Sequence, residues 1–410
     1  MAGPLSGVRV IEMSTWAALP GGGAILADWG AEVIKVEEPE GGGDPAREFN
    51  KVPKADGTSP IAPTWEQDNR NKKAITINVN KREGQEALHR LIKKADVFVT
   101  STRPSTLKKL HISYDELSKI NPRLIFLHLS GYGPKGPDAE RPGYDALCFW
   151  ARNGIGLALA KPDGSPTSQR AAMGDHTTSV TIAGGIAAAL YAREKTGKGQ
   201  HVQASLFHAG LWVMSADSVV ASYSGRDATP MNRGVVGNPL VGTYQCKDGW
   251  LQMVNLQSDR FWQPFCEALG RQDMAKDERY STSANRAPHA GALMAEFQKE
   301  FLKKKVEEWI PILDKHGIRW GRVQTVLGAT KDPQAWANGY FKTIEHPEAG
   351  TLNLVTSPIQ FSETPTEIKS IAPLWPHPSP APTPSRGTLS RKGRGKIVPP
   401  PQILRRSASG

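Results

Sequence analysis

The sequence has few cysteines, and their spacing forms no recognisable pair. Cys148, Cys246 and Cys266 are odd in number, lie far apart and occur in no CxxC spacing. This pattern argues against a disulfide framework and against a cysteine-based zinc site. Free, scattered cysteines are typical of a reducing compartment, so we expect a cytoplasmic protein.

Long apolar runs and several catalytic signatures are also missing. No window approaches about 18 unbroken apolar residues, and the first twenty residues lack a basic stretch followed by an apolar core. The sequence therefore predicts neither a membrane span nor a secretory signal. No histidines have the HxH or HExxH spacing of metal ligands, which predicts no metal site. The absence of GxSxG argues against a serine hydrolase.

Basic residues outnumber acidic ones, but unevenly along the chain. The net charge is +11, and residues 371–410 hold seven arginines and lysines and no acid. Residues 1–370 therefore carry only +4. A mildly basic body gives no reason to expect a nucleic-acid partner, although it suits a small anionic ligand.

In the first half of the chain, β-rich apolar runs alternate with helical patterns. Helices are expected at 84–95 and 113–120, and strands at 8–13, 32–38, 73–79, 96–100, 124–133 and 201–207. This alternation predicts an α/β fold with a mostly parallel sheet that helices cover on both faces.

The second half changes in character, and its pattern suggests a smaller domain. A segment rich in Gly, Ser and Asn is followed by a hairpin-like pair of strands around 247–249 and by helical stretches near 258–270 and 291–315. A chain of 410 residues exceeds the usual size of one core, so we expect two domains. The predicted division is a large domain at 1–220, a linker and small α+β domain at 221–330, a segment returning to the large domain at 331–370 and a tail at 371–410.

The tail is rich in proline and arginine. Nine prolines lie between Pro373 and Pro401, and proline removes backbone donors and blocks helices and central strands. We expect this segment to be extended or disordered. A ligand for a proline-binding domain and a basic phosphate-binding arm remain open as alternatives.

The stretch "PGGGAILADWG" after the first strand resembles part of a dinucleotide fingerprint. Gly21 and Gly23 match GxG, but Leu26 occupies the position of the third glycine. Glu37 and Glu38 end the next predicted strand, where the acidic residue of such a site belongs. With one glycine missing, a tight strand-to-helix turn with close packing is the favoured interpretation.

Two basic segments border predicted strands. Arg70, Lys72 and Lys73 flank Asn71 just ahead of one strand, and "TSTRPSTLKKL" (100–110) follows another. A charge run is usually a solvated face, yet two such loops at one edge of an α/β sheet would hold a polyphosphate. We expect both segments to line the same edge.

Asp175 in "GDHTTS" precedes a long apolar run rich in small residues. Aspartate is among the best N-cap residues, so the pattern alone predicts a helix cap. A carboxylate at a helix N-terminus is also stabilised in its ionised form and can attack an activated acyl group. The residues by themselves leave both roles open.

Several stretches together resemble family III CoA-transferases, the formyl-CoA transferase and carnitine CoA-transferase type. The matching stretches occur in the family's order and cover about residues 5–370: "GVRVIEMS", "ILADWGAEVIKVE", "NKKAITINV", "KKADVFVTSTRPSTL", "NPRLIFLHLSGYGPKGP", "PGYDA", "GDHTTS", "TGKGQHVQASLF" and "DERYSTSANR". The stretches "DPQAWANGYF" and "STWAALPGGGAILADWGAEV" resemble the branch that acts on 2-hydroxy acids and their enoyl counterparts, such as the phenyllactate:cinnamoyl-CoA transferases.

The resemblance implies a fold, an activity and a set of site residues. It implies a Rossmann-like large domain, an interlocked homodimer, and coenzyme A and acyl-CoA as substrates rather than a permanently bound cofactor. The family's nucleophile falls on Asp175, which would carry CoA as an aspartyl thioester on its way to a carboxylic acid. The CoA contacts fall on Asn71, Lys72, Lys73, Ser101, Thr102, Arg103 and Lys109, and the residues lining the active site are Ala17, Tyr144, Asp145 and Gly174.

Departures from the family pattern argue against two of the activities found in this superfamily. Ala17 and Glu38 replace a glutamine and a CoA-facing arginine of the formyl-CoA type, which argues against formyl-CoA and oxalate exchange. Acyl-CoA racemases of the same superfamily use a histidine at the position of Tyr144, and tyrosine is a poor base at neutral pH. A racemase or epimerase and a non-catalytic CoA-binding protein remain the alternatives.

Overall fold

The computed structural model describes residues 3–228 and 237–375. Its centre is a sheet of six parallel strands in the order β3-β2-β1-β4-β5-β6. The strands are β1 (Arg9–Met13), β2 (Glu32–Glu37), β3 (Lys73–Thr76), β4 (Val97–Thr100), β5 (Ile125–Ser130) and β6 (Gln200–Ser205). The predicted parallel sheet is confirmed, with strand ends shifted by a few residues.

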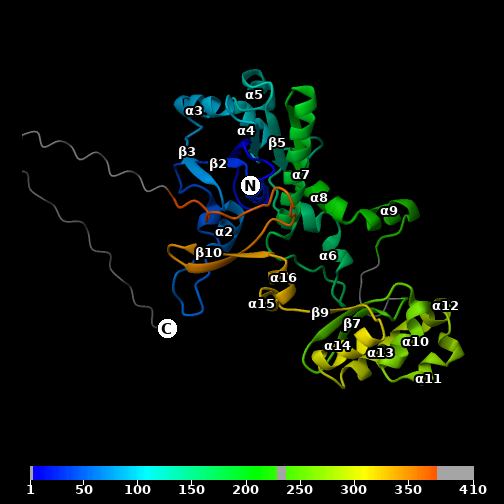
Figure 1. Cartoon of the computed structure of the whole chain (residues 1–410). Coiled ribbons are helices and arrows are strands. Elements are labelled where there is room, and N and C mark those ends of the chain that lie inside the picture. The colour runs from blue at the N-terminus through cyan, green and yellow to red at the C-terminus, as the bar shows by residue number, and fades with distance from the viewer. Residues whose placement is uncertain (1–2, 229–236, 376–410) are drawn as a thin grey trace, which may run out of the picture. The chain divides into compact units, whose positions relative to one another are not determined.

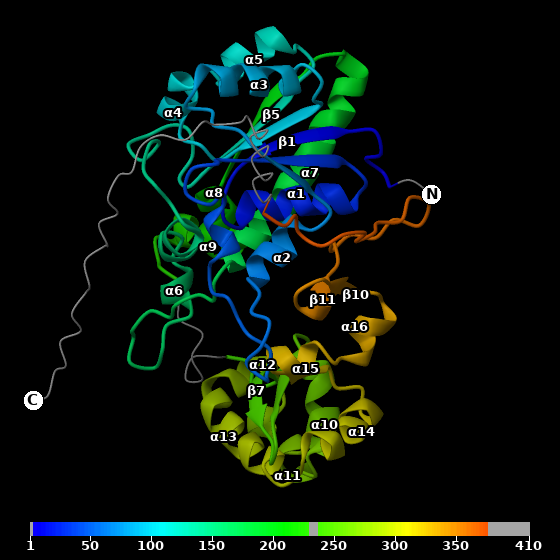
Figure 2. The same cartoon turned by 90° about the vertical axis from the view of Figure 1, so that its left-hand side faces the viewer.

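Helices cover both faces of this sheet, as Figures 1 and 2 show. On one face lie α3 (Arg82–Ile92), α4 (Pro104–Lys109) and α5 (Tyr114–Ile120), and on the other lie α1 (Ala18–Asp28) and the long α7 (Met173–Thr196). The remaining helices of this part are η1 (Pro45–Arg47), α2 (Pro63–Asn69), the π-helix η2 (Ala146–Ala151), α6 (Ile155–Ala158), α8 (Leu206–Val213) and α9 (Ser215–Ser224).

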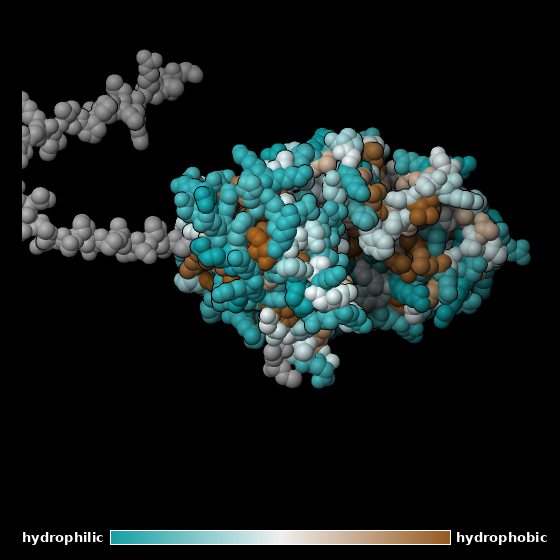
Figure 3. Space-filling model, turned by 90° about the horizontal axis from the view of Figure 1, so that it is seen from above, coloured by the Kyte–Doolittle hydropathy of each residue, from teal (hydrophilic) through white to brown (hydrophobic). Residues whose placement is uncertain are grey.

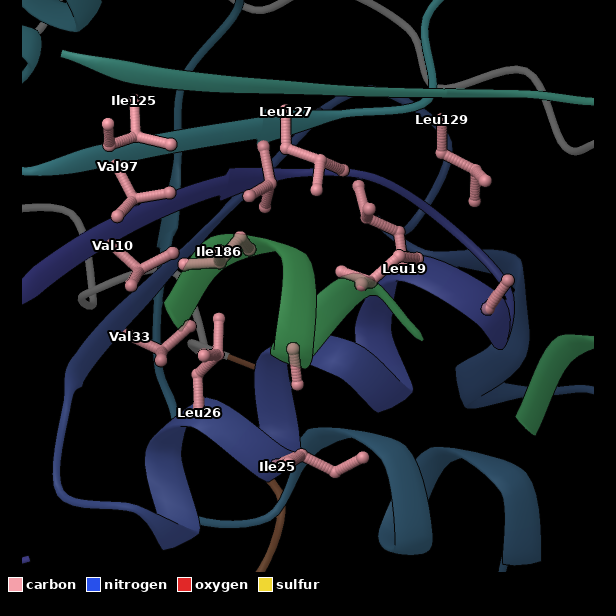
Figure 4. Close-up of a cluster of buried hydrophobic side chains, with 14 of the residues drawn as sticks. Val10, Leu19, Ile25, Leu26, Val33, Val97, Ile125, Leu127, Leu129 and Ile186 are labelled. Atoms are coloured by element: carbon pink, nitrogen blue, oxygen red, sulfur yellow. The ribbon is translucent and has the colours of Figure 1, made fainter. Parts of the chain in front are cut away.

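Alternation along the strands builds one core on each face of the sheet. In β4, Val97 and Val99 belong to the core beneath α1 and α7, while Phe98 between them belongs to the core beneath α3 and α5. Successive side chains of a strand point to opposite faces, so a central strand that is covered twice must be apolar throughout. The first core is drawn in Figure 4, where strand residues point toward Leu19, Leu26 and Ile186 of the two helices.

The three consecutive glycines of α1 allow it to lie directly against α7. A Cβ added at Gly21 would come within 2.5 Å of the Ser179 hydroxyl oxygen, and one at Gly22 within 2.8 Å of the Ile182 side chain. At Gly23 it would come within 2.0 Å of a Glu12 carboxylate oxygen. These glycines are therefore required by close packing, as predicted, but they lie within α1 and not in the tight strand-to-helix turn expected for "PGGG".

A second core lies in the C-terminal half. The antiparallel sheet β7-β8-β9 contains Val241–Gln245, Trp250–Val254 and Trp320–Val323, and its first two strands form the predicted hairpin. Its helices are α10 (Ser258–Ala268), α11 (Gln272–Ala275), η3 (Glu278–Tyr280), α12 (Ser283–Arg286), η4 (Ala287–His289), α13 (Ala290–Phe301) and α14 (Val306–Lys315). The helical stretch expected at 291–315 is divided, because a new helix begins after Lys305, whose backbone N–H donates to Glu308.

The chain then returns to residues near its start. After α15 (Val326–Ala329) and α16 (Pro333–Ala337), the antiparallel pair β10 (Phe341–His346) and β11 (Gly350–Val355) follows. The Gln67 side chain of α2 exchanges two hydrogen bonds with the Val355 backbone, and the Trp29 indole donates to Ser357. The proposed domain limits remain a prediction, and the predicted tail lies outside the described residues from 376 on, as do residues 229–236 of the linker.

Candidate active site

Two neighbouring cavities lie at the carboxyl ends of the parallel strands. The strand order reverses between β1 and β4, and in open α/β sheets ligands bind in the crevice beyond such a point. A cavity of about 510 Å³ and a neighbouring one of about 330 Å³ share Thr15, which follows β1, and Ser101, which follows β4. The two cavities therefore adjoin one another along this edge.

Asp175 lines the larger cavity from the first turn of α7. The helix begins at Met173, its N-cap residue is Ala172, and no side chain caps it from that position. The interpretation of Asp175 as the N-cap is therefore wrong, because the helix begins three residues earlier than the capping pattern indicated. Asp145 supplies the bond instead, since its carboxylate accepts from the Gly174 backbone N–H at 3.2 Å.

Gly174 has a packing role beside Asp175. A Cβ at this position would come within 2.5 Å of the Phe149 ring, which belongs to the buried face of the π-helix. The absence of a side chain thus lets the first turn of α7 rest on Phe149. This contact positions the first turn of α7, which carries Asp175.

The surroundings of Asp175 disfavour its charge. Burial raises the pKa of Asp175 to about 7, and the negative charges of Asp145 and Asp68 act in the same direction. The neighbouring His176 acts in the opposite direction and favours the carboxylate. A carboxyl group with such a pKa is ionised in a large fraction of molecules at neutral pH.

A buried carboxylate on another helix favours the protonated form of His176. Its Nε2–H donates to Asp68 at the end of α2, with a distance of 3.1 Å between the two atoms, and Asp68 is almost wholly buried. This hydrogen bond, more than any other interaction, raises the pKa of His176. Sequence reasoning placed no partner beside His176, because Asp68 is more than a hundred residues away along the chain.

Several predicted residues meet Asp175 around the site. Arg103 and Tyr144 line the larger cavity, Ser101 lines both cavities, and Thr102 lines the smaller one. Among the described residues, no hydrogen bond or ion pair engages the exposed Arg103 guanidinium. Ala17 is buried next to the lining residue Ala18, while Lys109 ends α4 and lines neither cavity.

The segment Asn71–Lys73 lies apart from these cavities. The Lys72 ammonium is fully buried and pairs with Glu12 at 2.8 Å, and burial lowers the pKa of Lys72 to about 8. Lys73 pairs with Glu32 on the surface, and the Asn71 side chain donates to Asp28 and accepts from the backbone N–H groups of Lys369 and Ser370.

The expectation that the two basic segments line one edge is wrong. Residues 70–72 precede β3, whereas residues 101–103 follow β4, and the two strands are parallel members of one sheet. The segments therefore lie at opposite ends of their strands. The assignment of Asn71, Lys72 and Lys73 to CoA remains a prediction without support from the cavities.

The structure adds lining residues that the sequence did not single out. Trp16, His128 and Arg141 join the larger cavity, each from a different loop or strand. The burial of His128 lowers its pKa, so the ring is neutral and donates from Nε2 to the Thr102 carbonyl oxygen. No spacing rule connects these residues, although Arg141 directly precedes the stretch "PGYDA" that carried part of the resemblance.

The described residues contain neither a metal-binding cluster nor a membrane-spanning helix. Within residues 3–228 and 237–375, no group of three His, Cys, Asp or Glu side chains is arranged to hold a metal ion. In the same part of the chain, every helix is too short or too polar to cross a bilayer.

Known proteins resemble this chain over most of its length. The family model described as CoA-transferase family III matches residues 5–376. An (R)-2-hydroxy-4-methylpentanoate CoA-transferase of Clostridioides difficile is 35% identical over 87% of this chain and 89% of its own length. A cinnamoyl-CoA:phenyllactate CoA-transferase of Clostridium sporogenes is 34% identical over 87% of each chain.

Solved structures show the same fold. A CAIB/BAIF family protein from Brucella suis has a TM-score of 0.79 at 30% identity and covers 91% of this chain, with 97% of its own chain covered. The Rv3272 protein from Mycobacterium tuberculosis has a TM-score of 0.80 at 26% identity, with the same coverage of each chain.

Proposed function

Because this chain belongs to CoA-transferase family III, we propose that it moves CoA from an acyl-CoA donor to a carboxylic acid through a thioester on Asp175. The observation that carries this proposal is the position of Asp175. Its carboxylate lines a cavity at the carboxyl edge of the sheet, and no capping bond holds it at the helix terminus. The names of the two bacterial relatives support a 2-hydroxy acid as the acceptor.

The proposed reaction has four steps, in each of which an acyl carbonyl is attacked. The Asp175 carboxylate attacks the donor thioester, which gives a mixed anhydride and releases the CoA thiolate. The thiolate then attacks the Asp175 carbonyl carbon, forms the aspartyl thioester and releases the donor acid. The acceptor carboxylate attacks this thioester and expels the thiolate, which finally attacks the acceptor carbonyl and frees Asp175.

The surroundings of Asp175 suit both halves of this cycle. In the first step the group becomes a neutral acyl derivative and it remains one until the last step, and burial favours the neutral form over the carboxylate. In the last step it leaves as a carboxylate, which the charge of His176 stabilises. Arg103 and Arg141 line the same cavity and are suited to a phosphate or carboxylate of the substrates.

Trapping with hydroxylamine tests the proposal. The full-length protein is incubated with an acyl-CoA and hydroxylamine, and the peptide containing Asp175 is examined by mass spectrometry for a hydroxamate. Asp175→Ala is expected to lose the hydroxamate and at least a thousandfold of the transfer rate. Asp163→Asn, a change in an exposed turn, serves as the control and is expected to keep both. Transfer that persists in Asp175→Ala would overturn the proposal.

The same incubation distinguishes the racemase alternative. A racemase removes and returns the proton next to the thioester carbonyl, so in deuterium oxide it labels the acyl-CoA without any acceptor acid. The proposed transferase leaves this position unlabelled. Deuterium at the α-carbon with no hydroxamate on Asp175 would favour the racemase.

We also propose that the chain forms a homodimer in a reducing cytoplasm. Large apolar side chains are exposed along α8 and α9, among them Trp212, Val219, Val220 and Tyr223. Figure 3 shows hydrophobic patches that interrupt an otherwise hydrophilic face. Contiguous apolar patches of this kind are typical of interfaces, and the three cysteines are buried and unpaired. A light-scattering mass of one chain would contradict the dimer.

A further inference from the structure

Trp16 has an unusual backbone conformation at the entrance to the larger cavity. It lies in the short turn between β1 and α1 with φ of 70°, in the left-handed region. A bulky residue seldom adopts this conformation, and such outliers cluster at functional sites where neighbouring contacts hold them in place. The question is what holds Trp16 there and what its ring does.

A buried charge network holds the backbone of Trp16. Its N–H donates to the Asp44 carboxylate at 3.1 Å. Asp44 pairs with Lys35 at 2.9 Å, and both side chains are wholly buried. Lys35 in turn pairs with Glu12 of β1 at 3.0 Å and donates to the Ser14 carbonyl oxygen. The buried ion pairs among Glu12, Lys35 and Asp44 thus hold this turn in place.

This conformation places the Trp16 ring in an aromatic group. Its ring centroid lies 5.4 Å from that of Phe49 and 6.0 Å from that of Tyr144, and both pairs meet edge to face. Phe49 and Tyr144 come from two separate loops, so three segments converge here. Edge-to-face contact is the favoured geometry of aromatic pairs, and it leaves part of each ring available to a ligand.

The aromatic group forms one wall of the cavity that contains Asp175. Trp16 and Tyr144 line this cavity, and the apolar side chains Leu19, Leu129 and Leu206 line it as well. An acyl group bound to Asp175 must occupy this space, because the attacked carbonyl carbon has to reach the carboxylate. Apolar and aromatic surfaces of this kind recognise an apolar acyl chain.

We propose that Trp16, held by Asp44 and packed against Phe49 and Tyr144, determines acyl specificity and selects an aryl group over a short alkyl chain. This inference rests on the proposed CoA transfer through Asp175. Trp16 acts by contact with the part of the substrate that does not react. Its removal therefore affects the choice between substrates more than the chemistry common to all of them.

The test compares two donors in variants of Trp16. Full-length protein is assayed with 3-phenylpropanoyl-CoA and with butanoyl-CoA, and kcat/KM is measured for each, together with hydroxamate formation on Asp175. Wild type is expected to prefer the aryl donor. Trp16→Ala is expected to lower this preference by about thirtyfold, and Trp16→Phe by less than about fivefold, because a ring is retained.

Two further variants keep the result interpretable. Trp16→Leu retains an apolar side chain of moderate size, so it tests for the ring if Trp16→Ala folds poorly, and it is expected to lose most of the preference. Trp336→Ala removes a tryptophan that stacks on Phe341 and lines neither cavity, and it is expected to leave both donors unchanged.

The outcomes separate this inference from the proposed function. Hydroxamate on Asp175 with both donors, but an unaltered ratio of kcat/KM in Trp16→Ala and Trp16→Leu, would overturn the role of Trp16 and leave the transferase intact. An equal fall with both donors would also overturn it. No hydroxamate with any donor in wild type would instead contradict the proposed function itself.

Discussion

Two basic segments of this protein look alike in sequence and differ entirely in the structure. In Arg70–Lys73, each cation has an acidic partner from another element: Arg70 pairs with Asp28, Lys72 with Glu12 and Lys73 with Glu32. In the segment after β4, the Arg103 side chain lines the larger cavity, and among the described residues no acid pairs with it. One segment supports the fold and the other is available to a ligand.

The difference shows that a cluster of cations is informative only when its partners are known. A buried ammonium costs several kcal/mol unless an anion compensates it, so Lys72 and Glu12 stabilise one another inside the protein. An exposed guanidinium at the carboxyl end of a strand keeps its hydrogen-bond donors for an anionic substrate. Variants in the two segments should therefore affect different quantities.

The largest effect is expected for Lys72→Met. It leaves the fully buried Glu12 carboxylate with Lys35 as its remaining cationic partner, so the free energy of unfolding should fall by about 3 kcal/mol. Urea unfolding measures this change. The double variant Glu12→Gln/Lys72→Met removes both charges and should recover part of the loss. Unchanged stability combined with a raised KM for acyl-CoA would return Lys72 to the binding site.

Arg103→Met is expected to weaken acyl-CoA binding and leave stability unchanged, the opposite of Lys72→Met. The KM for acyl-CoA should rise about tenfold, which corresponds to ~1.4 kcal/mol, because a charge-assisted contact to the substrate is lost. Its melting temperature should stay the same, since no ion pair within the described residues is broken. Arg82→Met, in an exposed pair with Glu86 on α3, is the matched control and should change neither quantity. A destabilised Arg103→Met would contradict the comparison.

His176→Gln tests how the charges around Asp175 determine its pKa. Asp175 reacts as a carboxylate, so kcat/KM should fall as the pH drops below about 7. Loss of the positive charge of His176 raises the pKa of Asp175 further and moves this acid limb to higher pH. In the wild type, the charges of Asp145, His176 and Asp68 act on the pKa of Asp175, and the titratable groups that line the same cavity are His128, Arg103, Arg141 and Tyr144.

A pH–rate profile from pH 5.5 to 9 (a range chosen to span about 1.5 units or more on each side of the limb) measures this shift. His111→Gln changes an exposed histidine that pairs with Glu116 and should leave the limb in place. An acid limb that does not move in His176→Gln would show that the Asp68–His176 pair has only a structural role.

The smallest effect is expected for Lys73→Met. Its pair with Glu32 is exposed, and such pairs contribute less than about 0.5 kcal/mol in most proteins. Both the stability and the KM for acyl-CoA should therefore stay close to those of the wild type. If Lys73→Met raised this KM as strongly as Arg103→Met, the structural contrast between the two segments would be wrong.

Features that short-range patterns determine were predicted correctly, and features that depend on contacts between distant segments were not. The six strands of the parallel sheet and the close packing at the glycines of α1 were predicted correctly, because alternation and local glycine spacing report them directly. The start of α7 was misplaced by three residues, because the carboxylate that caps its first turn belongs to Asp145, twenty-nine residues before Gly174. The basic segment 70–73 was assigned to a ligand because its acidic partners lie on β1, β2 and α1.

The sequence by itself determined the α/β architecture, the family and the identity of the candidate nucleophile, because short-range patterns and ordered motifs carry that information. Only the tertiary structure decided which charges are paired, which side chains share a cavity with Asp175, and that Trp16 is held by Asp44. Those properties depend on contacts between segments far apart in the chain, and no local spacing encodes them.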